Sequence, residues 1–166
     1  SYPGFFRRYL SDILGFAGAA PDTVLKYAGL FATQYRAYKD SADRLFADFS
    51  PYETEIRKGL QYVKHYFPRY PLPVKVITYV GPFDGYGDFI DPADSALGVG
   101  LQLHLGKDFS AYKTTLVQEV YPAYISARFE PSTIAVNCIQ NIVSDMYPEA
   151  ESDKPLAEQM VEKGKR

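Results

Sequence analysis

The feature that most constrains the fold is an alternating run near the middle of the chain, Ala96–Asp108, which reads ALGVGLQLHLGKD. Side chains of a β-strand point alternately to the two faces of a sheet. One face of this run is then apolar and carries Leu97, Val99, Leu101, Leu103 and Leu105. The other face carries Gly98, Gly100, Gln102 and His104. The pattern therefore predicts a strand over 97–105 with one face buried in the core.

The second face of this strand is a candidate groove, formed by Gly98, Gly100, Gln102 and His104. Because glycine has no Cβ, the two glycines allow the backbone of another element or of a partner to approach closely. Two interpretations of His104 stay open. It is either part of a binding site or a structural histidine, packed under a helix or hydrogen-bonded to Gln102.

The segments around this run predict an α+β fold that is mostly helical with a small β-sheet. Apolar residues recur at helical spacing, and Ser50, Pro51 and Glu53 form a capping-box signal that starts a helix over 51–67. Prolines end that helix, and Val74–Val80 follows as a β-branched strand. Further helices are predicted in the aromatic N-terminal part, within 112–128, from Pro131 and from near Pro155. We expect a single domain over 1–166, either complete or the N-terminal part of a longer chain.

Composition excludes several classes of function. The chain of 166 residues carries 18 Lys and Arg against 20 Asp and Glu, for a formal charge of −2, so it has no basic stripe for nucleic acid. Its single cysteine, Cys138, excludes an internal disulfide. No apolar run reaches the roughly 20 residues that span a bilayer. Tyrosines offer a weak case for sugar binding because the chain has no tryptophan.

The sequence contains no recognisable catalytic or cofactor motif. Neither a GxSxG nucleophile turn nor a glycine-rich phosphate loop is present. A thiol and base pair of Cys138 and His104 is disfavoured, because Cys138 falls on an apolar helix stripe where a buried thiol is inert. The aspartates of the loop before the alternating run lack the spacing of a calcium loop and are typical of turns; they are Asp84, Asp88, Asp91 and Asp94. We therefore expect no catalytic residue, no metal and no cofactor.

A family resemblance rests on several short motifs in the order in which they occur. These are FP and PLPV, ITYV, the run ALGVGLQLHLGKDFSAY, and YPAY. In this order they resemble the gliding-motility lipoprotein GldB family of Bacteroidetes-type bacteria, over residues 45–166 and more loosely before them. One departure is Gln102, where the family usually has an aspartate.

The resemblance implies a role that the residues alone would not give. It implies a non-enzymatic, periplasm-facing lipoprotein module of the cell envelope that supports or binds other envelope proteins. Membrane association would come only through a lipid anchor on a cysteine upstream of Ser1.

The layout also resembles a zincin, in which a strand lies beside a helix carrying HExxH. That motif works because histidines four residues apart converge on zinc, with the glutamate as general base. Here the corresponding helix reads NCIQN, so Asn137 and Asn141 take the histidine positions and Cys138 that of the base. Neither amide is a customary zinc ligand, which makes the motif a degenerate one. The alternative function is a zinc metallopeptidase-like enzyme whose remaining site residues lie outside this fragment.

We expect the chain to bind no stoichiometric zinc. A genuine site, at zinc 100 times its dissociation constant, would stabilise the fold by about 2.7 kcal/mol. For a chain of this size that raises Tm by roughly 5 to 10 °C. Elemental analysis and melting curves with zinc or with a chelator measure this directly, and one zinc per chain would contradict the expectation.

Overall fold

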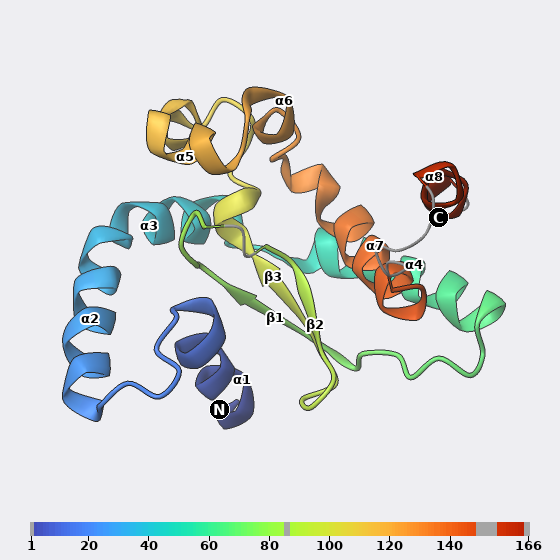
Figure 1. Ribbon diagram of the computed structural model, residues 1–166, viewed down its shortest axis with the longest axis horizontal. Helices are drawn as coiled ribbons and strands as arrows, with labels where there is room; N and C mark the ends of the chain where they lie inside the picture. The colour runs from blue at the N-terminus through green and yellow to red at the C-terminus, as the bar shows by residue number, and fades with distance from the viewer. Residues whose placement is uncertain (1, 85–86, 149–155, 165–166) are drawn as a thin grey trace.

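The computed structural model describes residues 2–84, 87–148 and 156–164, and it has an α+β fold that is mostly helical (Figure 1). The N-terminal half contains α1 (Pro3–Arg8), a π-helical turn η1 (Tyr9–Ile13), α2 (Pro21–Gln34), α3 (Arg36–Leu45) and α4 (Ser50–Tyr66). The C-terminal half contains η3 (Ser110–Lys113), α5 (Thr115–Val120), α6 (Ala123–Ser126), η4 (Pro131–Thr133), α7 (Ile134–Met146) and α8 (Leu156–Gly164). The predicted fold class is confirmed. The predicted start of the last helix, near Pro155, lies outside the described residues.

A sheet of three strands lies at the centre of the described chain, and its strands are β1 (Lys75–Tyr79), β2 (Phe89–Asp91) and β3 (Ala96–Gly100). The order is β1-β3-β2, with β1 parallel and β2 antiparallel to the central strand. Gly98 of β3 stands opposite both Ile77 and Phe89. The short strand β2 is not predicted by the sequence pattern.

Helices α4 and α7 cover one face of the sheet (Figure 1). Both present an apolar stripe at helical spacing, and the stripes meet the side chains of Leu97 and Val99 from β3. The two helices come close together at Gly59, where an added Cβ would lie 2.7 Å from the Ile139 side chain. His65 stands on the exposed side of α4, as its position outside the stripe predicts.

The N-terminal helix α1 covers the other face of the sheet. The Phe5 ring stacks on Phe89 of β2 with their centroids 5.8 Å apart. Arg8 then fixes the end of the helix, because its guanidinium lies 3.2 Å from the Asp91 carboxylate and 5.0 Å from the centre of the Phe89 ring. Since the Asp91 side chain is only 3% exposed, this ion pair is held at the edge of the core.

The prediction of one strand over 97–105 is wrong. β3 ends at Gly100, and the chain turns into a 3-10 helix, η2 (Leu101–Leu103). The buried Tyr112 hydroxyl holds this turn, because it donates to the Gln102 carbonyl at 2.7 Å and accepts from the Leu105 amide at 3.0 Å. The chain stays buried after the strand has ended because Leu101 remains in the first core and Leu103 enters a second one. Leu97, Val99 and Leu101 lie in the core under α4 and α7, whereas Leu103 packs beside Phe83, Tyr112 and Phe129.

The predicted capping box before α4 is also absent. Ser50 is the first residue of the helix, and the side chain of the N-cap residue, Phe49, forms no capping hydrogen bond. Asp48 accepts the Ser50 amide hydrogen at 2.9 Å instead. Glu53 pairs with Arg57 one turn further along.

Substitution of Gly98 by alanine tests the close packing of Phe89 against the central strand. An added Cβ would lie 2.6 Å from the Phe89 ring, which is itself held by Phe5, so Gly98→Ala should lower the free energy of unfolding by about 1 to 3 kcal/mol. Gly29→Ala is the matched control, because Gly29 lies in α2 with open space around it and should stabilise by up to about 1 kcal/mol. Denaturant unfolding compares the two variants, and equal shifts would contradict this packing.

Candidate functional site

Asp88 and His104 form a buried pair of an acidic and a basic side chain. Among the described residues it is the only such pair apart from the contact of Arg8 with Asp91. The side chains of Asp88 and His104 are 3% and 1% exposed, and His104 Nε2 lies 3.0 Å from Asp88 Oδ2 and 3.2 Å from Oδ1. Asp88 Oδ1 also accepts the Gly100 amide hydrogen at 3.0 Å. A carboxylate only accepts hydrogen bonds when it is ionised, and the ring then donates to it from Nε2. The carboxylate thus joins the loop before β2 to the end of β3.

The other side of the imidazole faces the start of α7. His104 Nδ1 lies 3.3 Å from both the Glu130 carbonyl oxygen and Thr133 Oγ1. The Thr133 hydroxyl in turn donates to the Glu130 carbonyl at 2.7 Å. We call Asp88, His104 and Thr133, together with the Glu130 carbonyl, the polar cluster. It connects three parts of the chain that are far apart in sequence.

The four residues of the predicted groove lie beneath other side chains of this chain. Gly98 is covered by the Phe89 ring, and a Cβ at Gly100 would lie 3.0 Å from Gln102 Nε2. Gln102 is 0% exposed and accepts the Gly81 amide hydrogen at 2.9 Å. His104 belongs to the polar cluster. The glycines therefore give room to side chains from within the chain, and this region offers no open groove.

The degenerate metal-motif positions all lie on α7. Cys138 is fully buried, and burial, followed by the nearby charge of Asp88, raises the pKa of its thiol to about 12. Asn137 and Asn141 are half-buried, and the Asn141 amide donates to the Asn137 carbonyl at 3.0 Å. At neutral pH the thiol stays protonated, so it is neither a nucleophile nor a metal ligand in this state.

The aspartates of the loop before β3 serve separate partners. Asp91 pairs with Arg8, and Asp94 lies 3.6 Å from Lys75. Asp84 is exposed. Within the described ranges no three His, Cys, Asp or Glu side chains are grouped to hold a metal ion.

No sequence pattern identifies Asp88 and Thr133 as partners of His104. The available signal was indirect, since a histidine inside an apolar run needs a polar partner when it is buried. Asp88 comes 16 residues before the histidine, across a loop whose path no local pattern specifies.

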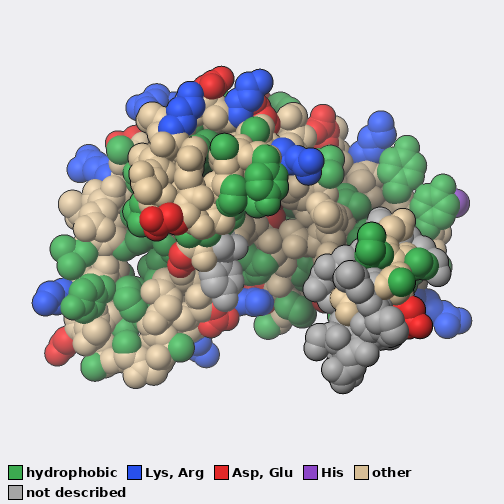
Figure 2. All heavy atoms as spheres, turned by 45° about the horizontal axis from the view of Figure 1, so that its top comes forward, with side chains coloured by type: hydrophobic (Ala, Val, Ile, Leu, Met, Phe, Trp, Pro, Cys, Tyr) green, Lys and Arg blue, Asp and Glu red, His purple; other side chains and the backbone are tan. Residues whose placement is uncertain are grey.

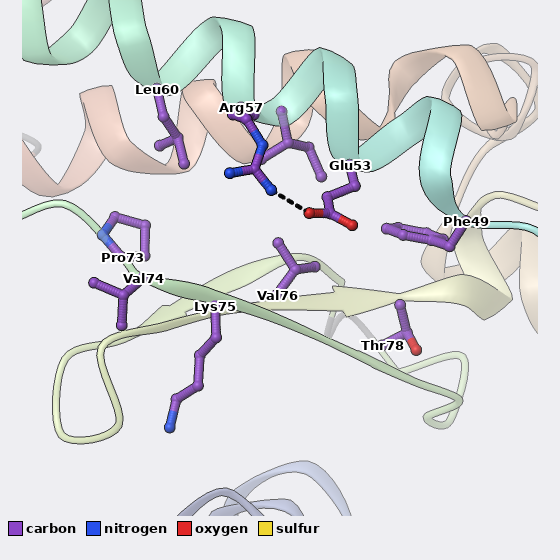
Figure 3. A pocket seen from close by; sticks show the side chains of 10 residues that line it. Phe49, Glu53, Arg57, Leu60, Pro73, Val74, Lys75, Val76 and Thr78 are labelled. Atoms are coloured by element: carbon purple, nitrogen blue, oxygen red, sulfur yellow. Dashed lines mark hydrogen bonds and ion pairs between the residues drawn. The ribbon is translucent and has the colours of Figure 1, made fainter.

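A surface hollow opens between α4 and the outer strand β1 (Figure 3). Its volume is about 620 Å³, and we call it the α4 hollow. Figure 3 shows Glu53, Arg57 and Leu60 pointing from α4 toward the strand, while Val76 points back toward the helix. Lys75 points away from α4, toward the other face of the sheet.

A larger, mainly apolar hollow of about 800 Å³ lies on the other side of β1, and we call it the N-terminal trough. Its walls come from α1, η1, α2 and α3, and its floor from β1. The apolar lining includes Phe5, Phe6, Leu10, Leu14, Ala28, Phe31, Tyr35, Ile77 and Tyr79. Large apolar side chains are exposed on α1 and α2: Phe6, which lines the trough, is 60% exposed, and Leu25 of α2 is 80% exposed. Figure 2 shows hydrophobic side chains breaking the surface on the left, over α2.

Comparison with known proteins places the chain in a family. The sequence model of the family described as gliding motility protein GldB matches residues 1–166. The chain belongs to this family. The family is one of gliding-motility lipoproteins, which points to the cell envelope. No described helix is both long and apolar enough to cross a membrane.

The remaining comparisons returned no match. Neither a curated protein nor a solved structure is significantly similar to the chain. The relation to zincins, and the zincin-like layout, therefore stay predictions.

Removal of the Asp88 carboxylate tests how much the polar cluster contributes to the stability of the fold. In Asp88→Ala the Gly100 amide and His104 Nε2 lose their buried acceptor, so the free energy of unfolding should fall by about 3 kcal/mol. The matched control is Asp108→Ala, whose side chain is 83% exposed beside Lys113 and should change stability by less than about 0.5 kcal/mol. Urea unfolding midpoints compare them, and a wild-type midpoint for Asp88→Ala would show that the cluster is dispensable.

Proposed function

We propose that the chain is a non-enzymatic module of a gliding-motility lipoprotein that binds other proteins of the cell envelope. The observation that carries the proposal is a contrast between the interior and the surface. The two chemically versatile side chains, His104 and Cys138, are fully buried. His104 is hydrogen-bonded to other residues of the chain, and the Cys138 thiol stays protonated. Large apolar side chains are instead exposed on α1 and α2. Exposed apolar patches next to a hollow are typical of protein-binding surfaces.

Membership of the GldB family supports the location of this role. A lipoprotein is held at a membrane surface by its lipid, so the protein part is free to engage neighbours. The N-terminal trough is the natural contact region, because it combines exposed rings with uncovered apolar walls. Aromatic side chains supply large contact areas at low cost in conformational entropy.

Photo-crosslinking in the native cells tests this role. A benzoylphenylalanine at Phe6, which is 60% exposed and lines the trough, should form an adduct with an envelope protein. The control carries the same group at Tyr124, which is 75% exposed on α6, far from α1 in Figure 1, and should form no such adduct.

Two results would contradict the proposed function. One is the same adduct pattern at Phe6 and Tyr124, because contact would then be unspecific. The other is hydrolysis of peptide substrates by the purified chain at a rate that a chelator abolishes, because that would establish the metallopeptidase alternative.

A further inference from the structure

The outer strand β1 has a free edge. Within the described part of the chain, β1 pairs with β3 on one side, and no strand pairs with it on the other. Thr78, near the middle of this strand, is exposed. The unpaired N–H and C=O groups of an edge strand are a template for another extended chain. Edge strands are commonly protected by an outward-pointing lysine, yet the only lysine of β1, Lys75, is turned toward Asp94 and the Tyr2 ring.

The two hollows flank this edge on opposite faces of the sheet. Val76 lines the α4 hollow, Ile77 lines the N-terminal trough, and Thr78 lines both. A strand placed beside β1 would point its side chains alternately to the two faces. Successive residues of that strand would therefore enter the α4 hollow, which Figure 3 shows, and the trough in turn.

The charges around the hollows indicate which side chains would fit. Every charged residue that lines them already has a partner within the chain: the pairs are Glu53–Arg57, Lys39–Asp43 and Lys75–Asp94. A charged residue of an added strand would find no free counter-charge here. The trough favours apolar side chains, whereas the α4 hollow, with its ion pair, accepts small polar ones.

We propose that the free edge of β1 binds an extended, uncharged segment of a partner protein, which adds a fourth strand to the sheet. The segment alternates apolar residues, which face the N-terminal trough, with small polar residues, which face the α4 hollow. Main-chain hydrogen bonds along β1 provide affinity, and the two hollows provide selectivity. This proposal rests on the proposed protein-binding function and names the surface and the kind of partner.

A second copy of this chain fits the edge less well than a single strand. The free edge lies between α4 on one face and α1 and α2 on the other, and a second copy would bring the same flanking helices against them. The strand is also only 5 residues long. A stable dimer buries at least about 1,200 Å² in total, far more than such a short strand pair supplies.

A synthetic peptide in which valine and threonine alternate, with both ends capped, is the probe. Its binding to the purified chain is followed by fluorescence anisotropy, and hydrogen exchange should show new protection of the amides of β1. The same peptide with N-methyl groups on two successive central residues loses an N–H donor on each of its edges, because successive N–H groups point to opposite edges, and it should not bind.

Two variants locate the site. Thr78→Lys places a charge on the free edge and should weaken peptide binding by at least about tenfold. Thr54→Lys is the matched control on α4, because Thr54 is exposed and does not line either hollow, and it should bind as the wild type does. Equal melting temperatures show that both variants fold.

The outcomes separate this proposal from the broader one. Equal binding of the N-methylated peptide, no binding of the alternating peptide, or wild-type binding by Thr78→Lys would overturn strand addition at β1. A dimer in sedimentation that Thr78→Lys dissociates would assign the edge to a second copy instead. If strand addition fails while Phe6 still gives a specific crosslink, the protein-binding function stands and its surface is the trough alone.

Discussion

The hydrogen bond between Asp88 and His104 is the interaction on which the arrangement of the sheet depends. It joins a loop, the end of the central strand and the start of α7, where neither side chain has access to water. An unpaired charge at this depth would destabilise the fold by several kcal/mol, so both groups must be present together. The cluster fixes the place where the chain leaves β3 and turns into η2. It also holds the start of α7 beside the end of β3.

The hydrogen bonds of Asp88 also determine which parts of the molecule are tightly packed and which stay uncovered at the surface. Because Asp88 and Gly100 fix β2 against β3, the Phe89 ring covers Gly98, and α1 packs on that ring in turn. Helix α2 has no comparable anchor and buries none of its side chains completely. The result is a tightly packed centre with an uncovered apolar trough beside it. A protein that binds others through such a surface requires no reactive group there, which agrees with the buried state of Cys138.

Much of the architecture could be predicted from the sequence, and the failures have physical causes. Helical periodicity located α4 and α7, since each has a clear apolar stripe, and the β-branched run located β1. Alternation alone could not show that the strand stops at Gly100, because Leu101 and Leu103 enter different cores with the same spacing. The pairing of His104 with Asp88 depends on the path of a loop, which carries no periodic signal. The free edge of β1 was equally hidden, since strand order follows from tertiary packing.

The most direct test of the central role of the polar cluster is the solvent exchange of the two histidine rings, observed by ¹⁵N–¹H NMR. The chain offers an internal control, because its only other histidine, His65, is exposed on α4. The account predicts a ring N–H signal from His104 that exchanges slowly with water and disappears in Asp88→Ala, alongside rapid exchange at His65. Rapid exchange at both rings in the wild-type chain would contradict it, because the Asp88–His104 hydrogen bond would then not be closed to solvent.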